Sequence, residues 1–574
     1  MASLNPYGKV NEADQERLLA RRKTRKRITI IALSSVVLVA VVVAAVFGGV
    51  SHNNKGTSST DDQSSISTSI KAACSVTLYP DSCYNSLSPL IKSGNIKPQD
   101  IFKLSVEVAL NELSRASQGA VDKLNVTDKM ALAALESCQE LLSLALDHLN
   151  SSLTVQDTTL LEAFDGFRTW LSSAGTYQQT CIDDLRAAAP GLNLSDLVSE
   201  KLRNSTEYTS NSLAIVSSLE SSVASIGNLG SIGRRLLSSF NHEQEPIWLS
   251  SVDRKLLQAK ASQIKADAVV AKDGSGKYKT IGAALKVVPE KSKKRFVIYV
   301  KKGIYVENVR VEKNMWNVVM IGDGKNATIV SGRLNFVDGT PTFQSATFAV
   351  FGKGFIARDM GFQNTAGAAK HQAVALMSTA DESVFYRCAM DAFQDTLYAN
   401  SNRQFYRECS IYGTVDFIFG NAAVVLQNCN ILPRTPMLGQ QNTITAQGKI
   451  DPNQNTGISI HNCTIWPSGN LTGVNTFLGR PWKNYSTTVY MQTTMGNLIH
   501  PTGWLPWVGT SAPDTIFYVE YQNNGPGAVI KNRVKWKGLK LNLNAKQVGK
   551  FAVKSFISGD KWLPAAGVTY KSSL

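Results

Sequence analysis

The stretch Gly413-Thr-Val-Asp-Phe-Ile-Phe-Gly-Asn421 places one carboxylate, Asp416, directly before a short apolar run. Phe417-Ile-Phe419 is bounded by glycine and asparagine, which is the pattern of a short β-strand between turns. An aspartate at such a position is most often a turn or capping residue. The stretch by itself therefore predicts local structure, and its chemistry depends on what surrounds it.

Similar short apolar runs recur on both sides of this stretch, from about Lys265 to the C-terminus. They are 296–300, 318–321, 348–351, 373–376, 384–386, 424–426, 458–460 and 489–491. Gly, Asn and Asp separate them and no amphipathic helix intervenes, so the pattern predicts an all-β domain, as a barrel, a sandwich or a parallel β-helix. Asn and Cys near the ends of runs, as in His461-Asn-Cys463, suit the stacked turns of a solenoid. Periodicity does not choose among the three folds.

Residues 70–222 have a helical pattern instead. Two stripes have the spacing of one helix face: Val106, Ala109, Leu110 and Leu113, and then Leu132, Leu135, Cys138, Leu142, Ala145 and Leu149. Ala, Leu and Ser dominate this part, and strands are not evident. An all-α four-helix bundle of the up-and-down type is the simplest fold.

The N-terminal 50 residues predict contact with a membrane. Residues 1–27 end in a cluster of six positive charges and are expected to be cytoplasmic. Residues 28–50 are almost entirely apolar and long enough to span a bilayer as a helix. A cleaved signal peptide is the alternative, since Ala44-Ala45 could supply a cleavage site, but an uncleaved type II signal-anchor is favoured. In either case the rest of the chain enters the secretory lumen.

The cysteines and sequons agree with that compartment. All eight cysteines lie after the apolar segment, four in each half: Cys74, Cys83, Cys138 and Cys181, then Cys388, Cys409, Cys429 and Cys463. Even numbers predict separate disulfide sets, with the first two cysteines closing a short hairpin and the next two joining two helices. No Cys-x-x-Cys pair or histidine cluster suggests zinc, so we expect no metal and no cofactor. Eight Asn-x-Ser/Thr sequons predict glycosylation: Asn125, Asn150, Asn193, Asn204, Asn326, Asn462, Asn470 and Asn484.

The charge is divided unevenly along the chain. Residues 258–574 have a net charge of +18 and residues 58–257 have −8, within a total of +16. The basic half predicts an anionic partner, and the acidic half could be its internal counterpart.

Two polar segments predict connections between the folded parts. Residues 51–69, rich in Ser and Thr, are expected to form a stem, and residues 223–257 a linker. The linker has two dibasic sites, Arg234-Arg235 and Arg254-Lys255, each followed by Leu-Leu. They predict cutting by a processing protease.

Five motifs in the β part identify a family. In chain order they are Gly303-Ile-Tyr-Val-Glu307, Gln372-Ala-Val-Ala-Leu376, Gln394-Asp-Thr-Leu397, Gly413–Asn421 and Leu478-Gly-Arg-Pro-Trp482. With them, residues 258–574 resemble the plant pectin methylesterases (pectinesterases) over nearly their whole length. The helical section resembles, by its layout and cysteines, the pectin methylesterase inhibitor domain that precedes the enzyme in some members.

The resemblance implies a right-handed parallel β-helix with a surface cleft and without a metal. By motif position it implies that Asp416 is the nucleophile, Asp395 the general acid/base, and Gln372 and Gln394 the oxyanion donors, with Arg480 beside Asp416. It implies substrate contacts for Thr342, Gln372, Arg480 and Trp482. It also implies a disulfide between Cys409 and Cys429.

The chemistry of these residue types agrees with those roles. A carboxylate is a weak nucleophile, so Arg480 would have to keep Asp416 ionised and oriented. Attack on a methyl ester creates an oxyanion, which amide N–H groups could stabilise. Methoxide needs a proton to leave, so Asp395 should begin protonated, its pKa raised by Asp416 and by apolar walls.

These inferences define partners and locations. The expected partners are methyl-esterified homogalacturonan, the chain's own pro-domain or a separate inhibitor protein, and the processing protease, but no nucleic acid. The pro-domain is expected to block the cleft until the linker is cut. The enzyme is then expected to reach the cell wall (apoplast), and before cutting to be held in the secretory membrane.

Three rival functions compete with this one. A serine esterase lacks support, because there is no Gly-x-Ser-x-Gly motif. A pectin-chain hydrolase or lyase could share a β-helix and paired carboxylates. The helical section could also act mainly as an inhibitor or retention module.

Two departures from the family's usual residues, Phe393 for Tyr and Met377 for Arg, leave the proposed proton and acyl transfers untouched.

Overall fold

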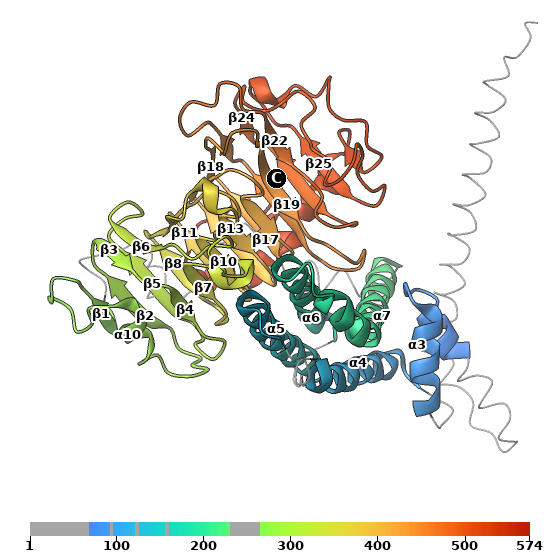
Figure 1. Ribbon diagram of the computed structural model, residues 1–574. Helices are drawn as coiled ribbons and strands as arrows, with labels where there is room; N and C mark the ends of the chain where they lie inside the picture. The colour runs from blue at the N-terminus through green and yellow to red at the C-terminus, as the bar shows by residue number, and fades with distance from the viewer. Residues whose placement is uncertain (1–67, 92–95, 121–125, 155–159, 230–264) are drawn as a thin grey trace, which may run out of the picture.

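The computed structural model describes residues 68–91, 96–120, 126–154, 160–229 and 265–574 (Figure 1). The basic segment, the apolar segment 28–50, nearly all of the stem, Asn125 and both dibasic sites lie outside the described residues. Within the described ranges, no helix is both long and apolar enough to cross a bilayer.

The N-terminal part is the predicted helical bundle. Its helices are α3 (Pro80–Leu87), α4 (Pro98–Ala120), α5 (Lys129–Leu153), α6 (Leu160–Ala188) and α7 (Leu194–Leu229). The Asp128 side chain accepts a hydrogen bond from the Ala131 N–H and so begins α5. Of the predicted stripe on α5, all members are buried except Leu132, which is 41% exposed. The four long helices α4 to α7 form the bundle, and α3 lies at one end of it.

Two disulfides confirm the cysteine predictions for this part. Cys74 is bonded to Cys83 across the turn before α3, and Cys138 joins α5 to Cys181 of α6. All four cysteines are buried in the core of the bundle.

The C-terminal part consists of three parallel sheets, and most coils of the chain contribute one strand to each sheet. The first sheet has eleven strands: β1 (Ala268–Val270), β2 (Phe296–Val300), β5 (Val318–Gly322), β8 (Ile356–Arg358), β11 (Ser383–Tyr386), β14 (Arg403–Arg407), β17 (Ala423–Gln427), β20 (Gly457–His461), β23 (Thr487–Met491), β25 (Phe517–Tyr521) and β26 (Leu539–Lys540). The second has seven: β4 (Val309–Val311), β7 (Phe348–Val350), β10 (Leu376–Ser378), β13 (Leu397–Ala399), β16 (Ile418–Gly420), β19 (Asn442–Gln447) and β22 (Thr476–Gly479). The third has eight: β3 (Gly303–Val306), β6 (Thr328–Gly332), β9 (Gly361–Asn364), β12 (Ala389–Asp391), β15 (Ser410–Gly413), β18 (Asn430–Pro433), β21 (Thr464–Ile465) and β24 (Thr494–Met495). This is the right-handed parallel β-helix that the family resemblance implied.

The turn from the eleven-stranded to the eight-stranded sheet repeats from coil to coil. One residue in each turn has a left-handed backbone: Asp359, Arg387, Glu408, Asn428, Asn462, Gln492 and Gln522. Four of these residues are followed by a buried cysteine, so Cys388, Cys409, Cys429 and Cys463 occupy equivalent places in four coils.

The predicted disulfide between Cys409 and Cys429 is wrong, because all four of these cysteines are free. These cysteines are stacked one coil apart, and their thiols form hydrogen bonds with backbone carbonyls. Cys409 donates to the carbonyls of Phe385 and Arg407, and Cys429 to those of Tyr406 and Gln427.

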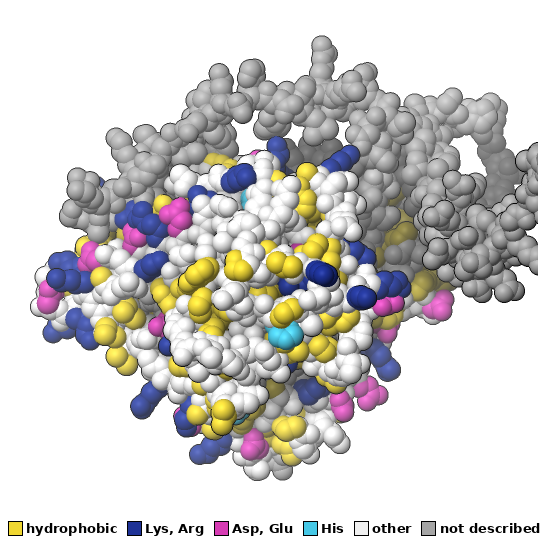
Figure 2. Space-filling model, turned by 90° about the horizontal axis from the view of Figure 1, so that it is seen from above, with side chains coloured by type: hydrophobic (Ala, Val, Ile, Leu, Met, Phe, Trp, Pro, Cys, Tyr) yellow, Lys and Arg dark blue, Asp and Glu magenta, His cyan; other side chains and the backbone are white. Residues whose placement is uncertain are grey.

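Short helices cover the N-terminal end of the β-helix and the outer face of its eleven-stranded sheet. Helix α10 (Ile281–Leu285) adds its apolar side chains to the core at the N-terminal end. After β26, the helices α11 (Ala545–Val548), α12 (Val553–Phe556) and α13 (Leu563–Ala566) follow. Their apolar residues pack on the outer face of the eleven-stranded sheet, as Trp562 and Leu563 do near Phe405. On the side seen from above, basic side chains lie mostly around the rim and apolar and uncharged ones in the middle (Figure 2).

The bundle sits on the outer face of the seven-stranded sheet (Figure 1). Val374, Met377, Tyr398 and Phe419 of the β-helix belong to the same buried apolar cluster as the interior of the bundle. Met377, noted above as a departure from the family's usual arginine, is fully buried in this contact. The two parts therefore share one continuous core in the intact chain.

Candidate active site

Two aspartates lie at equivalent places in consecutive coils. Asp395 precedes β13 and Asp416 precedes β16, and the register of these strands pairs Leu397 with Ile418, so the two carboxylates belong to the same ladder one coil apart. Neighbouring strands of a sheet are about 4.8 Å apart. Both aspartates have a left-handed backbone, with φ of 63° and 51°, which Asp tolerates better than most residues. The turn therefore presents both side chains outward, above the seven-stranded sheet.

Asp416 is held by two partners. Arg480, directly after β22, donates from Nε to Oδ1 at 2.8 Å and from Nη2 to Oδ2 at 2.6 Å, which is a bidentate ion pair. Thr443 occupies the next place in the ladder, and its hydroxyl donates to Asp416 Oδ1 at 2.6 Å. The Asp416 N–H donates in turn to the Thr443 hydroxyl at 2.8 Å. The ion pair with Arg480 and the hydrogen bond from Thr443 together hold the Asp416 carboxylate as an oriented anion.

Asp395 has the opposite environment. It is 7% exposed, and burial raises its pKa well above the usual value, with the negative charge of Asp416 as the second cause. Arg480 opposes the shift without cancelling it. Two neighbouring carboxylates with such different surroundings are typical of a pair in which one is ionised and the other carries a proton.

These groups line one cavity of about 430 Å³. All six residues that the resemblance placed at the site, besides Asp416, are part of its lining: Thr342, Gln372, Gln394, Asp395, Arg480 and Trp482. Sequence reasoning missed two further residues of the site. Trp507 also lines the cavity, with the Arg480 guanidinium 4.4 Å from its ring centre, and Thr443 supports Asp416 from below.

Helix α6 of the bundle forms the other wall of this cavity. Thr180, Asp183, Asp184 and Arg186 all line it. Asp184 accepts a hydrogen bond from the Phe343 N–H at 3.5 Å, and burial raises the pKa of Asp184 to about 7. The candidate site is thus closed on one side by the helical domain.

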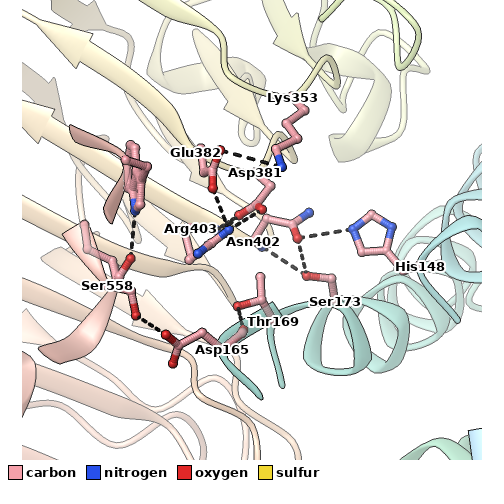
Figure 3. A network of polar contacts seen from close by, with 12 residues as sticks. His148, Asp165, Thr169, Ser173, Lys353, Asp381, Glu382, Asn402, Arg403 and Ser558 are labelled. Atoms are coloured by element: carbon pink, nitrogen blue, oxygen red, sulfur yellow. Dashed lines mark hydrogen bonds and ion pairs between the residues drawn. The ribbon is translucent and has the colours of Figure 1, made fainter. Parts of the chain in front are cut away.

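Further along α6, a polar network fastens the bundle to the β-helix (Figure 3). Asn402 is at its centre, since its side-chain oxygen accepts hydrogen bonds from Ser173 at 2.9 Å and contacts His148 at 3.2 Å. Asn402 also donates to the Tyr177 hydroxyl at 3.1 Å. At the far end, Asp165 accepts a hydrogen bond from Ser558 at 2.9 Å. These hydrogen bonds satisfy polar groups that the contact buries. They therefore fix the position of the bundle on the β-helix and also strengthen the contact.

The ion pairs across this contact have the same polarity. Among the described residues, acidic groups of the bundle meet basic groups of the β-helix in four pairs: Glu140 with Arg310, Asp147 with Lys313, Asp165 with Lys561, and Asp183 with Lys483. This agrees with the opposite net charges of the two halves. The three pairs other than that of Asp183 and Lys483 are solvent-exposed, and such pairs add little affinity each but steer association.

Asp395→Asn is expected to stabilise the chain at neutral pH. Because the native pKa is raised, the native state keeps this proton to a higher pH than the unfolded chain, where the pKa is about 3.9. The wild type therefore loses unfolding free energy as the pH rises from about 4 to the raised value, by about 1.4 kcal/mol per pH unit at most. Asn has no proton to lose, so its melting temperature should match that of the wild type near pH ~4 and exceed it near pH ~8.

The matched control is Asp514→Asn, which removes a carboxylate from a solvent-exposed ion pair with Lys537. Its melting temperature should follow that of the wild type at every pH. A pH-independent difference for Asp395→Asn would contradict the raised pKa.

The pectinesterase family model matches residues 267–560, and the plant invertase/pectin methylesterase inhibitor model matches residues 68–215. An Arabidopsis thaliana relative, whose name includes both pectinesterase and pectinesterase inhibitor, is 54% identical over 575 residues, which is 99% of this chain and 100% of its own. Pectinesterase 3 of Phaseolus vulgaris is 50% identical over 590 residues, covering 100% of this chain and 99% of its own.

Among solved structures, the pectin methylesterase from carrot is 52% identical, with a TM-score of 0.53. It covers 54% of this chain, whereas this chain covers 98% of the carrot protein. The β-helix part therefore corresponds to nearly the whole of the solved carrot chain, so we expect it to fold without the bundle. On these matches, the chain belongs to the pectinesterase family and has an N-terminal domain of the plant invertase/pectin methylesterase inhibitor family.

Proposed function

We propose that this chain hydrolyses the methyl esters of homogalacturonan through Asp416 as nucleophile, with Asp395 as general acid and base. The observation that carries the proposal is the contrast between the two aspartates in one cavity. Arg480 and Thr443 hold Asp416 as an oriented anion, whereas burial and Asp416 raise the pKa of Asp395. Nucleophile and proton donor are thus supplied by one ladder of the β-helix.

The reaction proceeds in two halves. A carboxylate oxygen of Asp416 attacks the ester carbonyl, and the side-chain N–H groups of Gln372 and Gln394 donate to the oxyanion that forms. The C–O bond to the methoxy group then breaks while Asp395 gives its proton, so methanol leaves and Asp416 carries an acyl group. Asp395, now a carboxylate, takes a proton from water as that water attacks the acyl carbon. The bond between the acyl carbon and the Asp416 oxygen then breaks, and Asp416 leaves as a carboxylate. The galacturonic acid product releases its remaining proton to solvent, and both aspartates return to their starting states.

The aromatic residues of the cavity suit a carbohydrate chain. Trp482 and Trp507 have ring centres 6.3 Å apart, and Trp507 is 37% exposed beside Arg480. Sugar rings can pack on such faces, and the basic charge of the β-helix attracts an acidic polysaccharide. Nothing in this geometry favours breaking the glycosidic bond over the ester, although paired carboxylates alone would permit it.

The second part of the proposal concerns the bundle. Since α6 forms a wall of the cavity and its polar side chains are fastened to Asn402 and Lys483, a polymer cannot enter while the bundle is seated. The bundle therefore inhibits the enzyme until the linker is cut and the bundle leaves.

Methanol release tests the activity directly. Purified residues 258–574 are incubated with highly methylated pectin, and methanol and pectin chain length are both measured. We expect methanol with no change in chain length. Shortened chains without methanol would instead support a pectin-chain hydrolase or lyase.

A further inference from the structure

One ion pair between the bundle and the β-helix differs from the other three. Lys483 donates from Nζ to Asp183 Oδ1 at 2.6 Å, and the side chains of the two residues are only 17% and 15% exposed. In each of the other pairs, such as Lys561 with Asp165, both side chains are about a third exposed or more. The pair of Lys483 also lies in the wall of the catalytic cavity, whereas the others lie outside its lining.

Lys483 is the available cation of this cavity. The β-helix contributes two cations to the described lining, Arg480 and Lys483, and Arg480 is engaged by both oxygens of Asp416. The Lys483 ammonium is paired instead with the Asp183 carboxylate of the bundle. Without the bundle, the Lys483 ammonium lacks that carboxylate.

The local structure holds Lys483 in place. Its N–H donates to the Ser486 hydroxyl at 3.1 Å, and that hydroxyl donates to the Lys483 carbonyl at 2.7 Å. The ammonium lies 5.2 Å from the ring centre of Trp482. A fixed cation beside an aromatic face is suited to a sugar that carries a carboxylate, because the ring can pack while the anion pairs.

We propose that Lys483 forms a subsite for a free galacturonate carboxylate, and that Asp183 of the bundle occupies this subsite as a substrate mimic. This rests on the proposed esterase function and adds a specificity to it. A methyl ester is neutral, whereas a free uronate has the charge and the carboxylate geometry of an aspartate side chain. The enzyme should therefore prefer a methylated unit at Asp416 when the unit beside Lys483 is already free.

The test compares two substrates in residues 258–574. Lys483→Gln should lower kcat/KM for methanol release from half-methylated pectin about tenfold and change it less than about twofold on almost fully methylated pectin. Lys483→Arg should restore most of the preference. Lys561→Gln is the matched control, because it also removes a lysine that pairs with the bundle but lies outside the cavity, and it should leave both values unchanged.

Binding of fully de-esterified oligogalacturonate, measured by calorimetry, separates this proposal from the esterase function. Wild type should bind it more tightly than Lys483→Gln, and more weakly as salt rises. Equal binding, or an equal loss of kcat/KM on both pectins, would overturn the subsite while leaving the esterase function intact. A wild type that binds but releases no methanol would overturn the esterase function and retain the subsite.

Discussion

Asp416→Asn is expected to lower kcat for methanol release from pectin by about a thousandfold or more. The neutral amide cannot attack the ester carbonyl, and the alternative of direct attack by water lacks the acyl intermediate. Asn accepts the left-handed backbone that Asp416 has, so the turn should keep its shape. The loss should therefore appear in kcat with little change in the fold. It is measured as methanol released by residues 258–574 under saturating pectin.

Two further variants make this result specific. Asp391→Asn also removes an aspartate from an ion pair with an arginine, Arg434, but outside the cavity, and should retain activity within a few-fold. Thr443→Val keeps the shape of the side chain and removes its hydrogen bond to Asp416, so it should lower kcat by an intermediate factor of about ten. If Asp416→Asn kept wild-type activity, Asp416 could not be the nucleophile.

The second large effect is expected from the bundle. Residues 68–574, uncut, should release methanol at least about a hundredfold more slowly than residues 258–574 at equal concentration. A substrate chain can enter only in the small fraction of molecules whose bundle has moved away, and the apparent affinity falls by that fraction. Methanol release before and after cutting at an inserted protease site in the linker provides the measurement.

Substitutions on the bundle distinguish inhibition from misfolding. Thr180→Arg places a large charge where Thr180 now accepts a hydrogen bond from Asn400, and should raise the activity of the uncut chain toward that of residues 258–574. Asp196→Arg introduces the same side chain on an exposed position of α7 and should leave the uncut chain inhibited. Full activity of the unmodified uncut chain would refute the inhibitory role.

Much of the β-helix could be predicted from the sequence, but unevenly. The nine apolar runs correspond to strands of the eleven-stranded and seven-stranded sheets, although the run 373–376 is displaced, since β10 begins at Leu376. No run was predicted in the eight-stranded sheet. Its strands are short, as in Thr464–Ile465, and several begin just after a cysteine or polar turn, so they lack the length from which a strand pattern is recognised.

The candidate site shows the same limit. The motif residues were placed through the family resemblance, whereas Thr443 is a single threonine within an ordinary strand. Its position became evident only from the register that aligns it with Asp416. The polar face of α6 was also missed. Thr169, Ser173, Thr176 and Thr180 follow a helical period and look like a solvent-exposed stripe, but all four form hydrogen bonds directly with the β-helix.

The contacts between the bundle and the β-helix would survive a cut in the linker. Cleavage between residues 229 and 265 would break none of the described contacts, because all of them lie outside that segment. It would instead turn an intramolecular equilibrium into a bimolecular one. Joined modules experience each other at an effective concentration of about millimolar, whereas separated ones are diluted to their actual concentration. A modest affinity between the bundle and the β-helix is then enough to inhibit the intact chain. The same affinity allows the two pieces to dissociate when they are diluted in the cell wall.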